Sequence, residues 1–209
     1  SDHRDAYSND TYAQEIIAVA DAAKLPQDSI LIAHSFGGLQ AIRTMAQYPD
    51  RFKGLILVDS GVRHPDDIKE REPQLERLGR AKVYPEREIA IARFRLQPPQ
   101  TCDNQYLVDH IARNSVEYDE GWVWKFDEEL NSRMTMNGDL ESDLKAIKGK
   151  LALIYGENSE SFKATSAAYM QELMPDMTLV ELKAAQHHLF LDQPLAFIDE
   201  VKKILAAWG

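Results

Sequence analysis

Short apolar runs alternate along the chain with longer amphipathic segments. The apolar runs predict buried strands at residues 29–33, 54–58, 151–155 and 177–182. Apolar positions three or four residues apart predict helices at residues 11–23, 37–48, 163–173 and 194–208. Asn9 or Asp10 is expected to cap the first of these helices, and Pro194 suits the first turn of the last. Strands that alternate with helices favour a parallel sheet flanked by helices, which is an α/β fold.

Residues 62–148 interrupt this alternation. They are rich in charge and carry helical patterns at residues 68–80 and 86–95, but no apolar run typical of a buried strand. We therefore predict an α/β core made of residues 1–61 and 149–209, with a mostly helical cap or lid inserted at residues 62–148.

Composition indicates which kinds of binding partner the protein is not expected to have. The net charge of −10 disfavours binding to the phosphates of nucleic acid. No apolar run approaches the roughly 20 residues that a membrane-spanning helix needs, so no membrane partner is expected. Cys102 is the only cysteine of the 209 residues. It has no partner for an internal disulfide, which is typical of a reducing, cytoplasmic setting.

The first candidate for chemistry is Ser35, in the stretch Ala33-His34-Ser35-Phe36-Gly37. A small-x-Ser-x-Gly pattern between a buried strand and an amphipathic helix is typical of a nucleophile on a strained turn. Small residues at positions 33 and 37 are expected to let strand and helix converge there. The backbone N–H of Phe36 then points toward a developing oxyanion. The alternative is a serine that merely caps a helix.

Two histidines follow the fourth predicted strand, at positions 187 and 188. A loop at this point returns to the sheet edge where Ser35 is expected, and imidazole has a pKa suited to proton transfer near neutrality. His187 is the candidate base, with His188 as the alternative. His34 is expected to line the site rather than to act as the base.

A carboxylate must orient the imidazole, and two positions qualify. Asp59 ends the second predicted strand, and Glu160 follows the third, close to Glu157. Either carboxylate can also be an ordinary helix cap. Residue patterns alone leave both candidates open.

These motifs together resemble the α/β-hydrolase superfamily, and the resemblance covers nearly the whole chain. It is carried by IAHSFGG, LVDSG, YGENS and HHLFLDQPLAF, in the superfamily's chain order of serine, acid and histidine. In the superfamily's closing motif the histidine stands seven residues before the proline that opens the last helix. Counting back from Pro194 gives His187, which the resemblance therefore favours over His188.

The resemblance also favours one of the two candidate carboxylates for orienting the histidine. Most members carry it as G-x-x-Asp after the strand that follows the cap, whereas this chain has Ser159 at the position of that aspartate. Certain esterases with G-x-N-S at this place use an acid after the preceding strand instead. The resemblance thus favours Asp59, with Glu160 as the alternative.

A serine nucleophile implies hydrolysis through an acyl-enzyme. Haloalkane dehalogenases and epoxide hydrolases of this fold carry aspartate there, so the resemblance implies hydrolysis of a small-molecule ester, thioester, amide or carbon–carbon bond. Perhydrolase activity and a slowly reacting ligand-sensing protein are the alternatives, and a truncated, non-catalytic piece is a third. Trp122 and Trp124 are expected to help form an apolar substrate pocket, or else simply to hold the cap together.

Neither a cofactor nor a metal is expected. The chain has no G-x-G-x-x-G motif and no His, Cys or Asp cluster with metal-ligand spacing. The resemblance further implies additional strands before residue 1, together with a loop that supplies the second oxyanion donor. We therefore expect an N-terminal segment of the same hydrolase as a partner, which would cover an otherwise open apolar sheet edge.

Overall fold

The computed structural model describes residues 3–69, 82–127 and 129–209, and the chain divides into two compact units. Unit 1 is built from Ser1–Tyr7 and Pro73–Met134, and unit 2 from Ser8–Glu72 and Thr135–Gly209. The internal segment of unit 1, Pro73–Met134, covers fewer residues than the insertion expected at residues 62–148. The reason is that helix α7 (Leu140–Lys145) packs on helix α2 (Phe36–Gln47) within unit 2.

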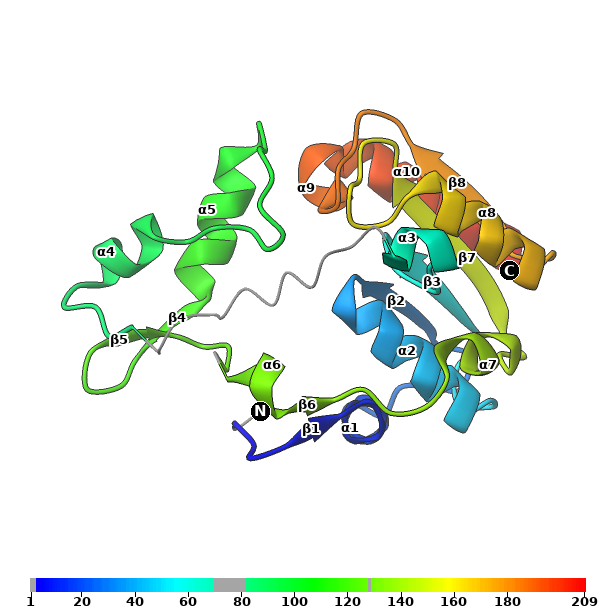
Figure 1. Ribbon diagram of the computed structural model, residues 1–209, viewed down its shortest axis with the longest axis horizontal. Helices are drawn as coiled ribbons and strands as arrows, with labels where there is room; N and C mark the ends of the chain where they lie inside the picture. Colours follow the sequence, from blue (N-terminus) through cyan, green and yellow to red (C-terminus); the bar gives the residue numbers. More distant parts are fainter. Residues whose placement is uncertain (1–2, 70–81, 128) are drawn as a thin grey trace. The chain divides into compact units, whose positions relative to one another are not determined.

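A four-stranded parallel sheet forms the centre of unit 2, in the strand order β2-β3-β7-β8 (Figure 1). Its strands are β2 (Ile30–His34), β3 (Gly54–Val58), β7 (Lys150–Gly156) and β8 (Thr178–Leu182). All four lie within two residues of the predicted apolar runs, so the predicted α/β fold class is confirmed. In the described part of the chain β2 is one edge of this sheet, and Ile32 on it is 50% exposed.

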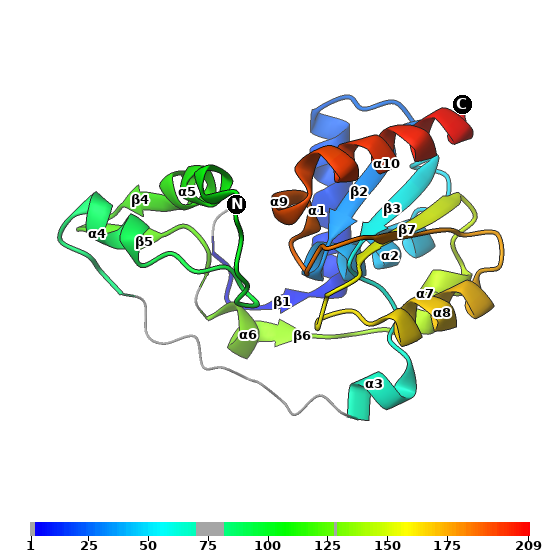
Figure 2. The ribbon, with the colours of Figure 1, turned by 90° about the horizontal axis from the view of Figure 1, so that it is seen from above.

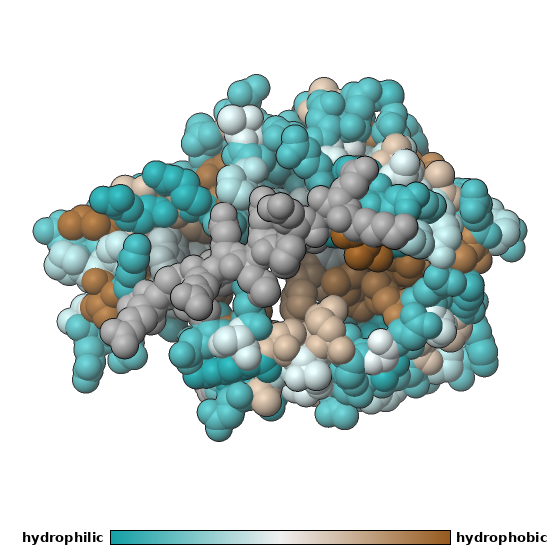
Figure 3. Space-filling view, viewed as in Figure 1, coloured by the Kyte–Doolittle hydropathy of each residue, from teal (hydrophilic) through white to brown (hydrophobic). Residues whose placement is uncertain are grey.

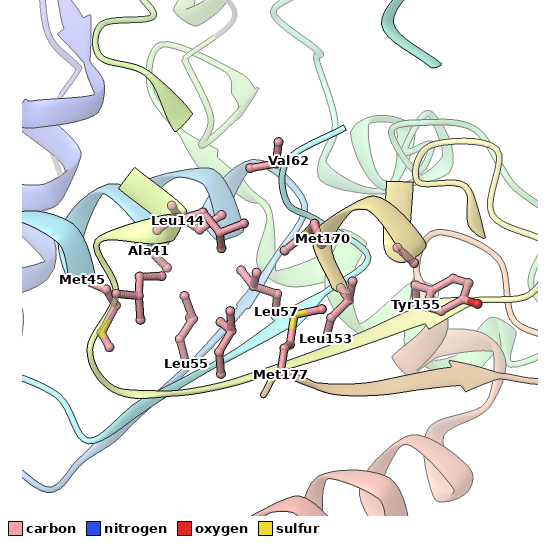
Figure 4. Packing of buried hydrophobic residues seen from close by; sticks show 14 of the residues in the cluster. Ala41, Met45, Leu55, Leu57, Val62, Leu144, Leu153, Tyr155, Met170 and Met177 are labelled. Atoms are coloured by element: carbon pink, nitrogen blue, oxygen red, sulfur yellow. The ribbon is translucent and has the colours of Figure 1, made fainter. Parts of the chain in front are cut away.

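Alternate side chains of the central strands enter two separate cores, because successive residues of a strand point to opposite faces. On one face Leu55, Leu57 and Leu153 meet side chains of α2, α7 and α8 (Ala164–Leu173), as the close-up in Figure 4 shows. On the other face Ile56 and Ile154 meet α9 (Leu189–Asp192) and α10 (Pro194–Trp208). Figure 2 shows α10 on one side of the sheet and α7 and α8 on the other. A sheet covered on both faces explains why its strands are continuous apolar runs.

Helix α1 (Asn9–Ala22) packs against α2 and begins earlier than its hydrophobic pattern predicted. Its cap is Ser8, whose hydroxyl accepts a hydrogen bond from the Thr11 N–H at 3.1 Å. The expected caps are therefore wrong: Asn9 is already helical, and the Asp10 carboxylate accepts from Arg43 instead. The short helix α3 (Pro65–Lys69) also belongs to unit 2. The rest of the helix expected at residues 68–80 lies outside the described residues.

Unit 1 has a small core of its own, formed by Ala90, Ile91, Ala112 and Val116. Its elements are α4 (Arg87–Ala92), α5 (Gln105–Asn114), α6 (Leu130–Arg133) and a hairpin of β4 (Val116–Tyr118) and β5 (Trp122–Trp124). The boundary between the units falls within two further strands, β1 (Tyr7–Ser8) and β6 (Met134–Thr135), which pair with each other.

Hydrophilic side chains cover most of the face drawn in Figure 3, in keeping with the net charge of −10. Across the described residues, none of the helices combines the length and the apolar character that crossing a bilayer requires.

Candidate active site

Two polar residues stand just beyond neighbouring strands, at the edge where the parallel strands end. Ser35 follows β2, and its N–H donates to the carbonyl of Val58 at 3.1 Å. Asp59 follows β3, and its N–H donates to the carbonyl of Ile154 at 2.8 Å. Each backbone is thus still held to the next strand of the sheet, which fixes both side chains at this edge.

Ser35 has a strained backbone. Its φ is +52°, a region that costs a residue with a Cβ about 1–3 kcal/mol. Its carbonyl accepts hydrogen bonds from the Ser60 hydroxyl at 2.5 Å and from the Gly38 N–H at 2.9 Å. These two donors hold the turn in place between β2 and α2.

Helix α2 lies close to β3 and to Ser60 at the position of Gly38. A Cβ on Gly38 would lie 2.4 Å from the Ser60 hydroxyl oxygen and 3.2 Å from a methyl group of Leu57. A Cβ on Gly37 would meet no atom of the described residues within 4 Å. The expectation that a small residue is needed at position 37 is therefore wrong, and the requirement lies one residue later.

Gly38→Ala is expected to lower the free energy of unfolding by about 1–3 kcal/mol, because the added methyl group overlaps Ser60 in a packed site. Gly37→Ala is the matched control, and it should leave stability equal or raise it by up to ~1 kcal/mol, since alanine favours helix more than glycine does. Urea unfolding of both variants measures the difference. Equal stabilities of the two variants would contradict the packing described here.

His187 links the two residues. It lies in the loop between β8 and α9, and its side chain is buried. Its Nε2 is 2.8 Å from the Ser35 Oγ, and its Nδ1 is 2.6 Å from the Asp59 Oδ2. A carboxylate oxygen accepts hydrogen bonds, so Nδ1 carries the ring proton and donates it. Nε2 is then free to accept the hydroxyl proton of Ser35.

His34 holds the loop that carries His187. Its Nε2 donates to the backbone carbonyl of His187 at 2.9 Å, and the two rings lie 4.6 Å apart. Burial lowers the pKa of His34 below its ordinary value, which favours the neutral ring near pH 7. The ring of His188 lies 5.2 Å from that of His34. Of the two candidate bases, His187 is the one in contact with Ser35.

Asp59 is the carboxylate that meets His187. It is 2% exposed and has a left-handed φ of +47°. Its Oδ1 accepts the Gly156 N–H at 2.9 Å, and its Oδ2 accepts the Ser159 hydroxyl at 2.6 Å as well as His187. Glu160 is exposed to solvent. The sequence motifs predicted no role for the Ser159 hydroxyl or for the Gly156 N–H. The one available signal was a serine standing where the superfamily usually has its acid.

Phe36 is the first residue of α2. Its N–H belongs to the first turn, for which the helix itself offers no acceptor. The expected role of this N–H as a donor to an oxyanion stays a prediction. The Phe36 side chain packs against Tyr12, and the two rings are nearly perpendicular with their centroids 5.4 Å apart.

Trp122 and Trp124 belong to unit 1, where both pack against its small core. The guanidinium of Arg87 lies over the Trp122 ring at 5.7 Å. A cavity of about 460 Å³ in this unit is lined by other side chains of α4, α5 and their flanks, among them Phe94, Arg95 and Val108. The expected role of the two tryptophans in a substrate pocket stays a prediction.

In the part of the chain that the structure describes, no three His, Cys, Asp or Glu side chains are grouped so as to hold a metal ion. The single cysteine, Cys102, is buried and is not part of a disulfide.

A parallel sheet flanked by helices, with a serine on the turn after one strand and a histidine on the loop after another, defines the α/β-hydrolase class of fold. The chain belongs to the Alpha/beta hydrolase family, whose family model matches residues 2–200. The resemblance of the four sequence motifs to the α/β-hydrolase superfamily is therefore confirmed.

Two curated relatives are similar over most of the chain. Pimeloyl-[acyl-carrier protein] methyl ester esterase of Chromobacterium violaceum is 26% identical over 187 residues, which cover 87% of this chain and 72% of that protein. An esterase of Mycobacterium tuberculosis is 25% identical over 189 residues, which cover 86% of this chain and 61% of that protein. The chain thus spans about two thirds of the length of these relatives.

Solved structures share the fold at lower identity. The E-2-(acetamidomethylene)succinate hydrolase matches 99% of this chain and 77% of its own, with a TM-score of 0.76 and 17% identity. The thioesterase domain from the curacin biosynthetic pathway matches 95% of this chain and 74% of its own, with a TM-score of 0.72 and 21% identity. At these identities the similarity shows that the fold is shared, and it does not identify a substrate.

Proposed function

We propose that the protein is a carboxylic ester hydrolase that works through a serine nucleophile. The observation that carries this proposal is the unbroken chain of hydrogen bonds from the Ser35 Oγ through His187 to Asp59, at 2.8 and 2.6 Å. Ser35 stands on a strained turn at a sheet edge, in the arrangement that nucleophilic catalysis requires. The names of the two curated relatives, both esterases, support the same reaction class.

The reaction proceeds in two halves. The Ser35 Oγ bonds to the ester carbonyl carbon while its proton moves to His187 Nε2, and the Phe36 N–H donates to the oxyanion. His187 then protonates the leaving alcohol as the ester bond breaks, which leaves an acyl group on Ser35. A water molecule next gives a proton to His187 and attacks the acyl carbon. The proton returns to Ser35 as the carboxylic acid leaves, and Asp59 holds the imidazole ring throughout.

The proposed substrate is a small, uncharged ester with an apolar acyl or aromatic group. Support comes from the aromatic residues Trp122 and Trp124, whose expected part in an apolar substrate pocket stays a prediction. Thioesters react by the same steps, because the tetrahedral intermediate is of the same kind. No step requires a cofactor.

A series of p-nitrophenyl esters with acyl chains of two, four and eight carbons tests this function on the full-length protein. The expected result is a burst of p-nitrophenol equal to the concentration of enzyme, followed by slower steady turnover. A burst without turnover indicates a ligand-sensing protein that acylates and stops, and contradicts the hydrolase. Absence of both burst and turnover with every ester contradicts a serine nucleophile.

A further inference from the structure

Ser159 brings a further hydroxyl to the candidate active site, in contact with Asp59. It follows β7, and the residue is 9% exposed. Its Oγ lies 2.6 Å from the Asp59 Oδ2, the same carboxylate oxygen that accepts from His187 Nδ1 at 2.6 Å. Two donors from different strand ends therefore converge on one oxygen.

The direction of the Ser159 hydroxyl is fixed by its other neighbours. Its oxygen accepts the backbone N–H groups of Ser161 and Phe162, both at 3.2 Å. Because these bonds occupy the acceptor side of the oxygen, the hydroxyl proton is left to donate to the carboxylate. Hydrogen bonds of a hydroxyl to an ionised acceptor are short and comparatively strong.

The second oxygen of Asp59 is held independently. Oδ1 accepts the Gly156 N–H at 2.9 Å. A Cβ on Gly156 would lie 2.5 and 2.6 Å from the carbonyls of Gln186 and Ala185, so this glycine lets the end of β7 approach the loop that carries His187. Each oxygen of Asp59 thus accepts a hydrogen bond from a residue at or just after the end of β7, in addition to the contact with His187.

We infer that Ser159 is a positioning residue for the reaction, an inference that rests on the proposed function. The Ser159 hydroxyl holds the carboxylate of Asp59 in the rotamer that receives His187 Nδ1–H. That contact in turn directs His187 Nε2 at Ser35. Ser159 itself touches neither Ser35 nor, in the proposed mechanism, the reacting atoms.

Ser159→Ala should lower kcat and kcat/KM together, by about 10- to 100-fold, which corresponds to the loss of one hydrogen bond to a charged group. Ser159→Thr retains the hydroxyl and should recover most of this loss, whereas Ser159→Cys, a weak donor of similar shape, should stay close to Ser159→Ala. Glu160→Gln, which alters the adjacent exposed side chain, should leave kcat within about twofold of wild type.

The experiment measures p-nitrophenyl ester kinetics of these variants on the full-length protein. It also follows the low-field ¹H NMR resonance of the His187 Nδ1 proton, which reports the bond to Asp59 directly. The expected result is a shifted resonance and a lower kcat in Ser159→Ala and Ser159→Cys, with both restored in Ser159→Thr. Thermal unfolding shows whether each variant is folded. If Ser159→Ala is misfolded, Ser159→Cys serves as the variant that lacks a strong hydrogen-bond donor.

Two failures are distinguishable. Wild-type kcat and an unchanged resonance in Ser159→Ala overturn the role of Ser159 and leave the proposed function standing. Equal losses of kcat in Ser159→Ala and Ser159→Thr also overturn it, because the hydroxyl is then not what matters. Absence of turnover and of Ser35 acylation in the wild-type protein overturns the proposed function itself.

Discussion

Ser35→Ala is expected to lower kcat/KM for p-nitrophenyl esters by about 1,000-fold or more, with no loss of stability beyond ~1 kcal/mol. The methyl side chain has no atom that can form the acyl-enzyme, so the reaction loses its first covalent step. The fold is retained because the sheet and turn are held by the backbone: the N–H of residue 35 still donates to Val58, and its carbonyl still accepts from Ser60.

The matched control for this variant is Ser132→Ala. Ser132 is an exposed residue of unit 1, and its hydroxyl donates to the Glu129 carbonyl. This variant should keep wild-type kinetics, because the hydroxyl it removes lies on a solvated helix surface. Retention of more than a tenth of wild-type activity by Ser35→Ala, in a preparation free of other esterases, would show that another group is the nucleophile.

Asp59→Asn is expected to lower kcat by about 1,000- to 10,000-fold. The asparagine amide can present N–H groups where Asp59 accepts, and His187 then shifts its proton from Nδ1 to Nε2. A protonated Nε2 cannot accept from Ser35, so proton transfer from the nucleophile is lost. The effect is large because Asp59 is buried, and solvent does not supply a substitute charge.

Glu160→Gln is the control for Asp59→Asn, because it makes the same change of carboxylate to amide in the other candidate acid. Glu160 is exposed, and the variant should retain kcat within about twofold of wild type. The ratio of the two kcat values decides between the acids without knowledge of the natural substrate. A damaging Glu160→Gln together with a harmless Asp59→Asn would reverse the assignment.

Most of unit 2 could be predicted from the hydrophobic pattern, for a physical reason. Strands covered by helices on both faces must be apolar along their length, and β3 (Gly54–Val58) matches the predicted run of residues. The final helix begins at Pro194 as expected. In unit 1 the hairpin of β4 and β5 escaped prediction, because its three-residue strands are too short to show an alternating pattern.

The candidate site was predictable where it depends on spacing along the chain, and not where it depends on contacts across the sheet. Ser35 carries a local strand-turn-helix signature. Asp59 and Glu160 both follow strands, so nothing in their spacing separates them. Their difference lies in burial and in the distance to His187. Gly38 was missed for the same reason, because its neighbour Ser60 approaches from another strand end.

The most direct test of the central claim is to locate the covalent adduct of a fluorophosphonate probe. The full-length protein is treated with the probe, digested, and analysed by tandem mass spectrometry. We predict one adduct per chain, on the Ser35 Oγ, formed far more slowly in Asp59→Asn because His187 is no longer oriented to accept the Ser35 proton. An adduct on any other residue, or ester turnover by a protein whose Ser35 stays unmodified, would contradict a nucleophilic Ser35 activated by His187 and Asp59.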